Sequence, residues 1–142
     1  MDDEPSWQER RREASAIQAA ALERRKAAET EQARAQLAEF VLKLKAAGVR
    51  PEPLRAPVVG SGTSYRTDIV GWYLRRNRSI GLDADGNYYI LGTPASVKAR
   101  LLGLRIVPSD PPLIVGVGAR DGESIALVDL LRLRLEAGDN WP

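Results

Sequence analysis

Between Pro5 and Ala47 the chain contains no glycine and no further proline, which leaves a long helix as its main structural option. Alanine, glutamate, glutamine, arginine and lysine fill most of this segment, and these residues have high helix propensities. Pro5 suits a first helical turn, and Gly48 suits the position after a helix end. A continuous helix over the segment would be roughly 65 Å long. A domain of about 100 residues has a radius of gyration near ~13 Å, so part of this helix must project or pair with something.

The two ends of the expected helix differ in their apolar pattern. Leu37, Phe40, Val41 and Leu44 follow the i, i+3, i+4, i+7 spacing of an apolar helix face. We therefore expect residues 33–47 to dock on a compact domain. Residues 1–32 are expected to form an exposed, charged, alanine-rich helical extension, because large apolar side chains are scarce there.

One row of residues recurs every seven positions: Trp7, Ala14, Ala21, Ala28, Ala35 and Leu42. Its companion row is not the apolar d row of a coiled coil, because it reads Arg10, Ile17, Arg24, Glu31, Ala38 and Lys45. Two interpretations stay open. The extension is either a solvated helix, supported by pairs such as Arg25 with Glu29, or a helix that binds a partner. The candidate partner-binding residues are Trp7, Ile17, Ala21 and Ala28, with Trp7 as the interface anchor.

The rest of the chain, residues 33–142, is expected to form one compact domain. Residues 49–64 are rich in proline and glycine and predict a surface connector. Strands are expected at Asp68–Leu74, Ser79–Leu82 and Asn87–Leu91, the last two joined by a turn at Asp83–Gly86.

Further elements are expected toward the C-terminus. Thr93 as N-cap, Pro94 at the first position and Gly103 after the end predict a short helix. Residues 104–108 and 111–118 are two more candidate strands. Ser124 is the expected N-cap of a last helix that Gly138 ends. The predicted fold class is α+β, with a long N-terminal helix, a small, mainly antiparallel sheet of about four or five strands, a short helix and a C-terminal helix.

Composition excludes several kinds of chemistry. The chain has no cysteine and no histidine, which excludes disulfides, thiolate nucleophiles, histidine triads and the usual zinc sites. We expect no catalytic residue, no cofactor and no metal. No apolar run approaches the ~18 residues that a transmembrane helix needs, and the N-terminus lacks a secretory apolar region, so we expect a cytoplasmic protein that does not bind membranes.

Aromatic residues and arginines are interleaved in the stretch from Gly71 to Leu91. A nucleic-acid interface would line up aromatics beside the cations, and its candidate residues are Arg75, Arg76, Arg78, Lys98 and Arg100. Successive side chains of a strand point to opposite faces, so Trp72 and Tyr73 cannot share one surface. The alternative is a core strand with Trp72 buried and a solvated arginine-rich turn. The net charge of +2 is too small to favour a polyanion partner by itself.

The segment "LIVGVGARDGES", residues 113–124, combines glycines with the start of a helix, as dinucleotide-binding turns do. Too few residues follow the last helix for a second parallel strand, so that interpretation fails. A small anion could still be held by backbone amides at the helix start, with Gly118, Arg120 and Ser124 as candidates. The alternative is a glycine-bearing loop capped by Ser124.

The patterns "GWYLR", "DGNYYIL" and "PPLIVGVGARDGES", followed by a leucine-rich last helix, resemble small uncharacterised proteins of GC-rich bacteria. The resemblance covers about residues 33–141. It implies a self-contained domain and no particular activity.

Three functional hypotheses follow, in order of preference. The first is a non-enzymatic binding or adaptor protein that uses its long helix to contact a protein partner or another copy of itself. The second is a nucleic-acid-associated protein, and the third is a binder of small anions at the loop of residues 116–124.

Overall fold

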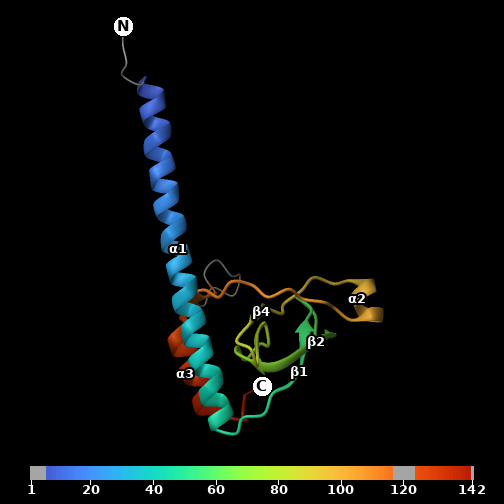
Figure 1. Ribbon diagram of the computed structural model, residues 1–142. Coiled ribbons are helices and arrows are strands. Elements are labelled where there is room, and N and C mark those ends of the chain that lie inside the picture. The colour runs from blue at the N-terminus through green and yellow to red at the C-terminus, as the bar shows by residue number, and fades with distance from the viewer. Residues whose placement is uncertain (1–5, 117–123, 142) are drawn as a thin grey trace.

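The computed structural model describes residues 6–116 and 124–141. Helix α1, Trp7–Ala46, is a single rod whose C-terminal end lies beside the sheet and whose N-terminal end extends far beyond it (Figure 1). Ser6 caps the helix together with Glu9: each side chain bonds the backbone N–H of the other at 3.2 Å. Pro5 lies outside the described residues. After the end of the helix, Gly48 has a φ of +73°, as expected for the residue that follows a helix end.

The main sheet contains four antiparallel strands in the order β1-β2-β3-β4. Their bounds are Glu52–Pro57, Ser64–Tyr73, Ile80–Asp83 and Tyr88–Ile90. The expected hairpin between β3 and β4 is confirmed, with Gly86 at a φ of +85°. Gly71 permits close pairing of β2 with β3, because a Cβ there would lie only 1.9 Å from the Leu82 carbonyl oxygen.

The prediction of a connector over residues 49–64 was wrong for its central part, which forms β1. Strand β1 lies at the edge of the sheet, where Pro53 and Pro57 need not donate to a second neighbour. Its register shifts between Pro53 and Arg55, which indicates a bulge. Leu54 and Ala56 are buried on either side of the exposed Arg55.

Each face of the sheet carries a buried cluster, and the expected alternation is confirmed. Trp72 and Tyr88 pack with the docked end of α1 and with α3, Leu127–Ala137, and the Trp72 indole donates to the Val49 carbonyl at 3.1 Å. Tyr73 and Tyr89 belong to a separate cluster on the other face.

Several predictions for the C-terminal half were wrong in detail. The N-cap of helix α2, Val97–Leu102, is Ser96 and not Thr93. The backbone N–H of Thr93 donates instead to the carbonyl of Pro57, at the end of β1. Residues 104–108 form no strand; Leu104 makes an isolated bridge with Thr67 of β2.

The last helix also begins differently from the prediction. The candidate strand at 111–118 is reduced, within the described residues, to β5, Ile114–Val115, paired with β6, Ile125–Ala126. Because β6 separates Ser124 from α3, Ser124 is not the cap of that helix. The predicted α+β class, with its long helix and antiparallel sheet, is nevertheless confirmed. Within the described chain no helix is both long and apolar enough to cross a membrane.

Candidate functional site

The seven-residue row of α1 lies on the side of the helix that faces away from the domain. Ala21 and Leu37 are sixteen positions apart, so their side chains point about 160° apart around the helix axis. Leu37 is fully buried against the domain, whereas the row is exposed apart from the partly buried Ala21. We call this row, Trp7, Ala14, Ala21, Ala28, Ala35 and Leu42, the outer row.

The outer row continues along the docked half of the helix. Trp7 is 64% exposed at one end and Leu42 is 67% exposed at the other, and Ile17, at 68%, lies beside the row. The Arg11 guanidinium lies 4.3 Å above the Trp7 ring and covers part of it. The four candidate partner-binding residues therefore share one helix face, within an arc of about 80°.

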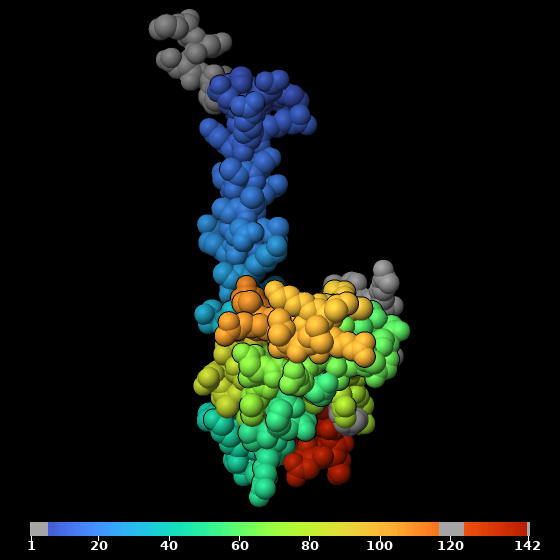
Figure 2. Space-filling view, turned by 90° about the vertical axis from the view of Figure 1, so that its right-hand side faces the viewer, coloured from blue at the N-terminus to red at the C-terminus, as the bar shows by residue number. Residues whose placement is uncertain are grey.

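Most of the projecting part of α1 lies clear of the other elements that the structure describes. From Ser6 to Gln32 all residues are exposed except Ala21 and Thr30, which are partly buried. Figure 2 shows this part of the helix as an isolated rod rising above the domain. Its 26 residues from Trp7 to Gln32 span about 39 Å.

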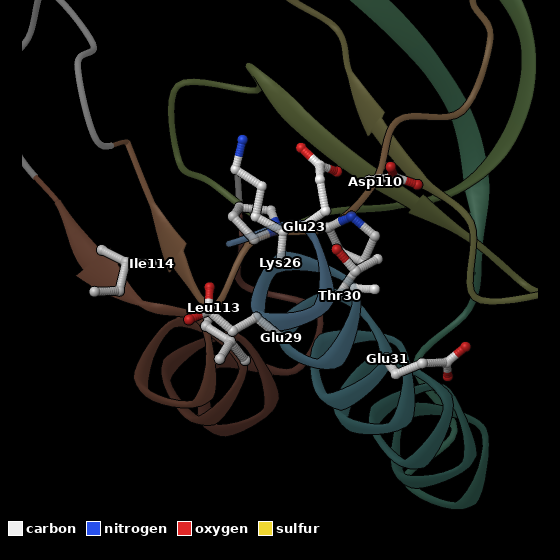
Figure 3. A pocket seen from close by; sticks show the side chains of 11 residues that line it. Glu23, Lys26, Glu29, Thr30, Glu31, Asp110, Leu113 and Ile114 are labelled. Atoms are coloured by element: carbon white, nitrogen blue, oxygen red, sulfur yellow. The ribbon is translucent and has the colours of Figure 1, made fainter. Parts of the chain in front are cut away.

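A groove lies where α1 leaves the domain (Figure 3). Its volume is about 890 Å³, and one wall is the segment Asp110–Ile114. The other wall is formed by six residues of α1: Glu23, Lys26, Ala27, Glu29, Thr30 and Glu31. An ion pair between Arg34 and Asp110 fastens that segment to the helix. Glu23, Glu29 and Glu31 make the helical wall acidic. The described residues contain no group of three or more carboxylates placed to hold a metal ion.

The aromatic–arginine stretch does not form the surface that a nucleic acid needs. The Arg76 guanidinium lies 4.6 Å above the Trp141 ring, and that of Arg78 lies 5.5 Å above the Tyr73 ring. Trp72 and Tyr73 are buried, so their ring faces are not available to bases. These contacts are typical of cation–π packing within a fold.

The five candidate nucleic-acid residues fall into two groups. Lys98 and Arg100 lie on α2, which contacts the start of β2 through Tyr65 and Arg66. The three arginines at 75, 76 and 78 follow the other end of β2, about 26 Å away along the strand. The structure therefore does not bring these five residues into one patch.

The tyrosines of β4 are structural groups. Burial, together with a 2.9 Å hydrogen bond to the Asp83 carboxylate, raises the pKa of Tyr89 to about 12. Burial also raises the pKa of Tyr88 to about 12, although the positive charge of Arg75 acts in the opposite direction. Both hydroxyls therefore stay protonated at neutral pH. Asp83 also accepts from the backbone N–H groups of Asp85 and Asn87, and this explains the tight turn.

Arg134 is a buried cation that ties the domain together. Burial lowers its pKa, while the negative charges of Glu52 and Asp139 raise it. Its Nε donates to the Tyr73 carbonyl at 2.8 Å, and its Nη1 donates to the Gly138 carbonyl. This arginine joins α3 to β2.

The candidate anion loop, residues 116–124, is described only at its two ends, Gly116 and Ser124. Gly118 and Arg120 lie outside the described residues, and Ser124 directly precedes β6. A different cluster of arginines, at β1, β2 and α2, was not foreseen from the sequence. Its members are Arg55, Arg66 and Arg100, which line one hollow of about 420 Å³.

Comparison of the chain with models of protein families, with curated proteins and with solved structures finds no match. Function is therefore inferred from the residues and their geometry.

Proposed function

We propose that the protein is a non-enzymatic binding protein that acts through the outer row of α1, and that this row binds the same row of a second copy. The observation that carries the proposal is the position of the outer row on the surface of α1. It is apolar, exposed along nearly the whole helix and turned away from the domain, so a second helix can lie along it without meeting the sheet.

The composition of the outer row suits a helix as its partner. Alanine side chains at four successive seven-residue positions let two helix backbones approach closely, and Trp7 supplies a large anchor at one end. A strict seven-residue row drifts about 20° per heptad around a straight helix. Two such helices keep their rows in contact by winding around each other with a left-handed supercoil.

Charge favours an antiparallel arrangement of the two copies. Parallel pairing would place the charged residues of the companion row, Arg10, Arg24 and Glu31, each against its own copy. Antiparallel pairing with Ala21 on the two-fold axis instead sets Ala14 against Ala28. The same register places Trp7 opposite Ala35, a large side chain against a small one.

The antiparallel register also pairs opposite charges at its edge. Arg10 of one copy lies nearly level with Glu31 of the other on the same edge, because both belong to the companion row, and the symmetry repeats this pair. The resulting dimer is closed and holds two compact domains at opposite ends of a helical rod, an arrangement suited to an adaptor.

The test is the mass of the full chain in solution, measured by sedimentation over about a hundredfold range of concentration. We expect a dimer for the wild type and a monomer for Ala21→Glu, which buries a charge at the axis. Ala19→Glu is the matched control, because Ala19 is exposed and points about 160° away from Ala21; it should leave the dimer intact. A monomeric wild type, or the same mass for both variants, would overturn the proposal.

The nucleic-acid hypothesis is the weaker proposal, because the aromatic side chains that it requires are packed inside the fold. It would rest on Arg75, Arg76 and Arg78 alone, two of which lie over aromatic rings of the domain itself.

A further inference from the structure

The hollow beside the edge strand contains an arrangement of charge that opposes folding. Arg55 of β1 and Arg66 of β2 are direct cross-strand partners in the antiparallel ladder, so their side chains leave the same face of the sheet side by side. Like charges placed directly opposite each other destabilise a sheet. Arg100 of α2 lines the same hollow and adds a third positive charge.

Among the described residues, no carboxylate compensates these charges. The remaining lining residues are Thr63, Ser64 and Tyr65, and none of the three arginines forms an ion pair with any residue that the structure describes. Other arginines of the fold are paired: Arg34 with Asp110, and Arg132 with both Asp129 and Glu136. The hollow thus brings together three arginines that no such ion pair neutralises, two of them direct cross-strand neighbours.

The guanidinium groups are partly fixed in place. Arg55 donates from Nε to the Ser64 hydroxyl at 2.8 Å and from Nη2 to the Ser64 carbonyl at 2.9 Å. Arg66 makes a longer contact of 3.4 Å from Nη2 to the Leu101 carbonyl, at the end of α2. A guanidinium has five N–H donors, so most of them are available to a ligand.

We propose that this arginine hollow binds the phosphate groups of a small, multiply charged ligand, with inorganic pyrophosphate as the simplest example. The planar fork of arginine matches phosphate oxygens in pairs, and three such forks around one hollow suit an anion of several charges. The Thr63 and Ser64 hydroxyls lie on the same wall and can donate to the same oxygens.

The surroundings favour a small ligand over a nucleic-acid strand. Tyr65 offers no ring for stacking a base, since it is buried and its hydroxyl accepts from the Ser96 N–H at 2.7 Å. Beyond Arg100 the surface of α2 is apolar, because Val97 and Leu101 are more than 70% exposed. A polyanionic strand would gain nothing from these side chains.

The experiment is a calorimetric titration of the full chain with pyrophosphate at low salt, alongside the melting temperature with and without this ligand. We expect binding and a rise in melting temperature for the wild type. Arg66→Gln and Arg55→Gln should each weaken binding about tenfold or more. The matched control is Arg50→Gln, an exposed arginine that precedes β1 and does not line the hollow, and it should change binding by less than about twofold.

A second readout separates a ligand site from a merely structural arginine. Without ligand, Arg66→Gln should melt at the same or a higher temperature than the wild type, because it removes the cross-strand repulsion. A lower melting temperature with unchanged pyrophosphate binding would overturn the proposal, as would the absence of binding to the wild type. An oligonucleotide that binds more tightly than pyrophosphate, and loses this binding in Arg66→Gln, would replace the small ligand by a nucleic acid.

Discussion

The two halves of α1 are one uninterrupted helix with opposite surroundings. The docked half, residues 33–46, buries five side chains, among them Leu37, Phe40 and Leu44, whereas the projecting half buries none. The helical geometry is the same in both. Local propensity and the Ser6 cap thus favour one continuous helix, while packing on the domain stabilises its docked half alone.

This difference has an energetic consequence. Most of the stability of helices in proteins comes from tertiary packing of one face, and propensity alone leaves an isolated helix marginal in water. The projecting half has only propensity, its cap and pairs within the helix to rely on. A partner helix along the outer row would provide the projecting half with the tertiary packing that the domain provides to the docked half.

The largest effect is expected where the docked half is buried most deeply. Leu37→Ala should lower the free energy of unfolding by about 2–5 kcal/mol, because it leaves a cavity beneath a fully buried side chain. Leu42→Ala, on the exposed side of the same half, should change it by about 0.5 kcal/mol or less. Denaturant unfolding measures both, and equal losses would contradict the division between an inner and an outer face.

The next effect concerns α3, on which the docked half rests. Arg134→Gln should cost about 1–3 kcal/mol, because it leaves the buried Tyr73 carbonyl without the donor bonded to it. Arg132→Gln, on the exposed side of the same helix, removes only surface ion pairs and should cost about 0–1 kcal/mol. The same denaturant experiment compares the two, and an equal cost would show that Arg134 does not join α3 to the sheet.

A smaller effect is expected when the same substitution, alanine to glycine, is made in each half of α1. Ala33→Gly in the docked half should lower the unfolding free energy of the domain by about 1 kcal/mol, through lost helix propensity. Ala19→Gly in the projecting half should leave that free energy unchanged and appear only as a slight loss of helical circular dichroism. A drop in domain stability for Ala19→Gly would mean that the projecting half contributes to the fold of its own chain.

The smallest effect is a pH dependence confined to the compact part. The pKa of Tyr89 is raised from 10.0 to about 12 in the folded state, so the hydroxyl stabilises the fold fully below pH 10. Between pH 10 and about 12 the unfolded chain loses this proton first, and the free energy of unfolding falls. Tyr89→Phe should make this decline shallower in alkaline denaturation curves; identical slopes would contradict the role of the Asp83 hydrogen bond.

Sequence patterns predicted correctly those elements that local spacing and turn chemistry determine. The helix over residues 7–46, its buried face at Leu37 and Leu44, and the hairpin at Asp83–Gly86 all follow from spacing and turn chemistry. The edge strand β1 did not, because proline counts against a strand unless the strand is known to lie at an edge.

The sites depended on contacts that no local pattern encodes. The groove joins residues 23–31 to the segment Asp110–Ile114, almost eighty residues later in the chain. The arginine hollow requires the register that opposes Arg55 to Arg66, after a bulge, and the placement of Arg100 on α2. The outer row was visible in the sequence, but its exposure depended on which face of α1 the domain covers.

Crosslinking through a single introduced thiol tests the antiparallel outer-row dimer most directly, because the chain contains no cysteine of its own. In Ala21→Cys the two thiols lie at the two-fold axis and should join under mild oxidation into a covalent dimer. In Ala14→Cys the two thiols would be about 21 Å apart along the axis and should stay reduced. A crosslink in both variants would show a parallel pair, and a crosslink in neither would show that the outer row does not bind a second copy.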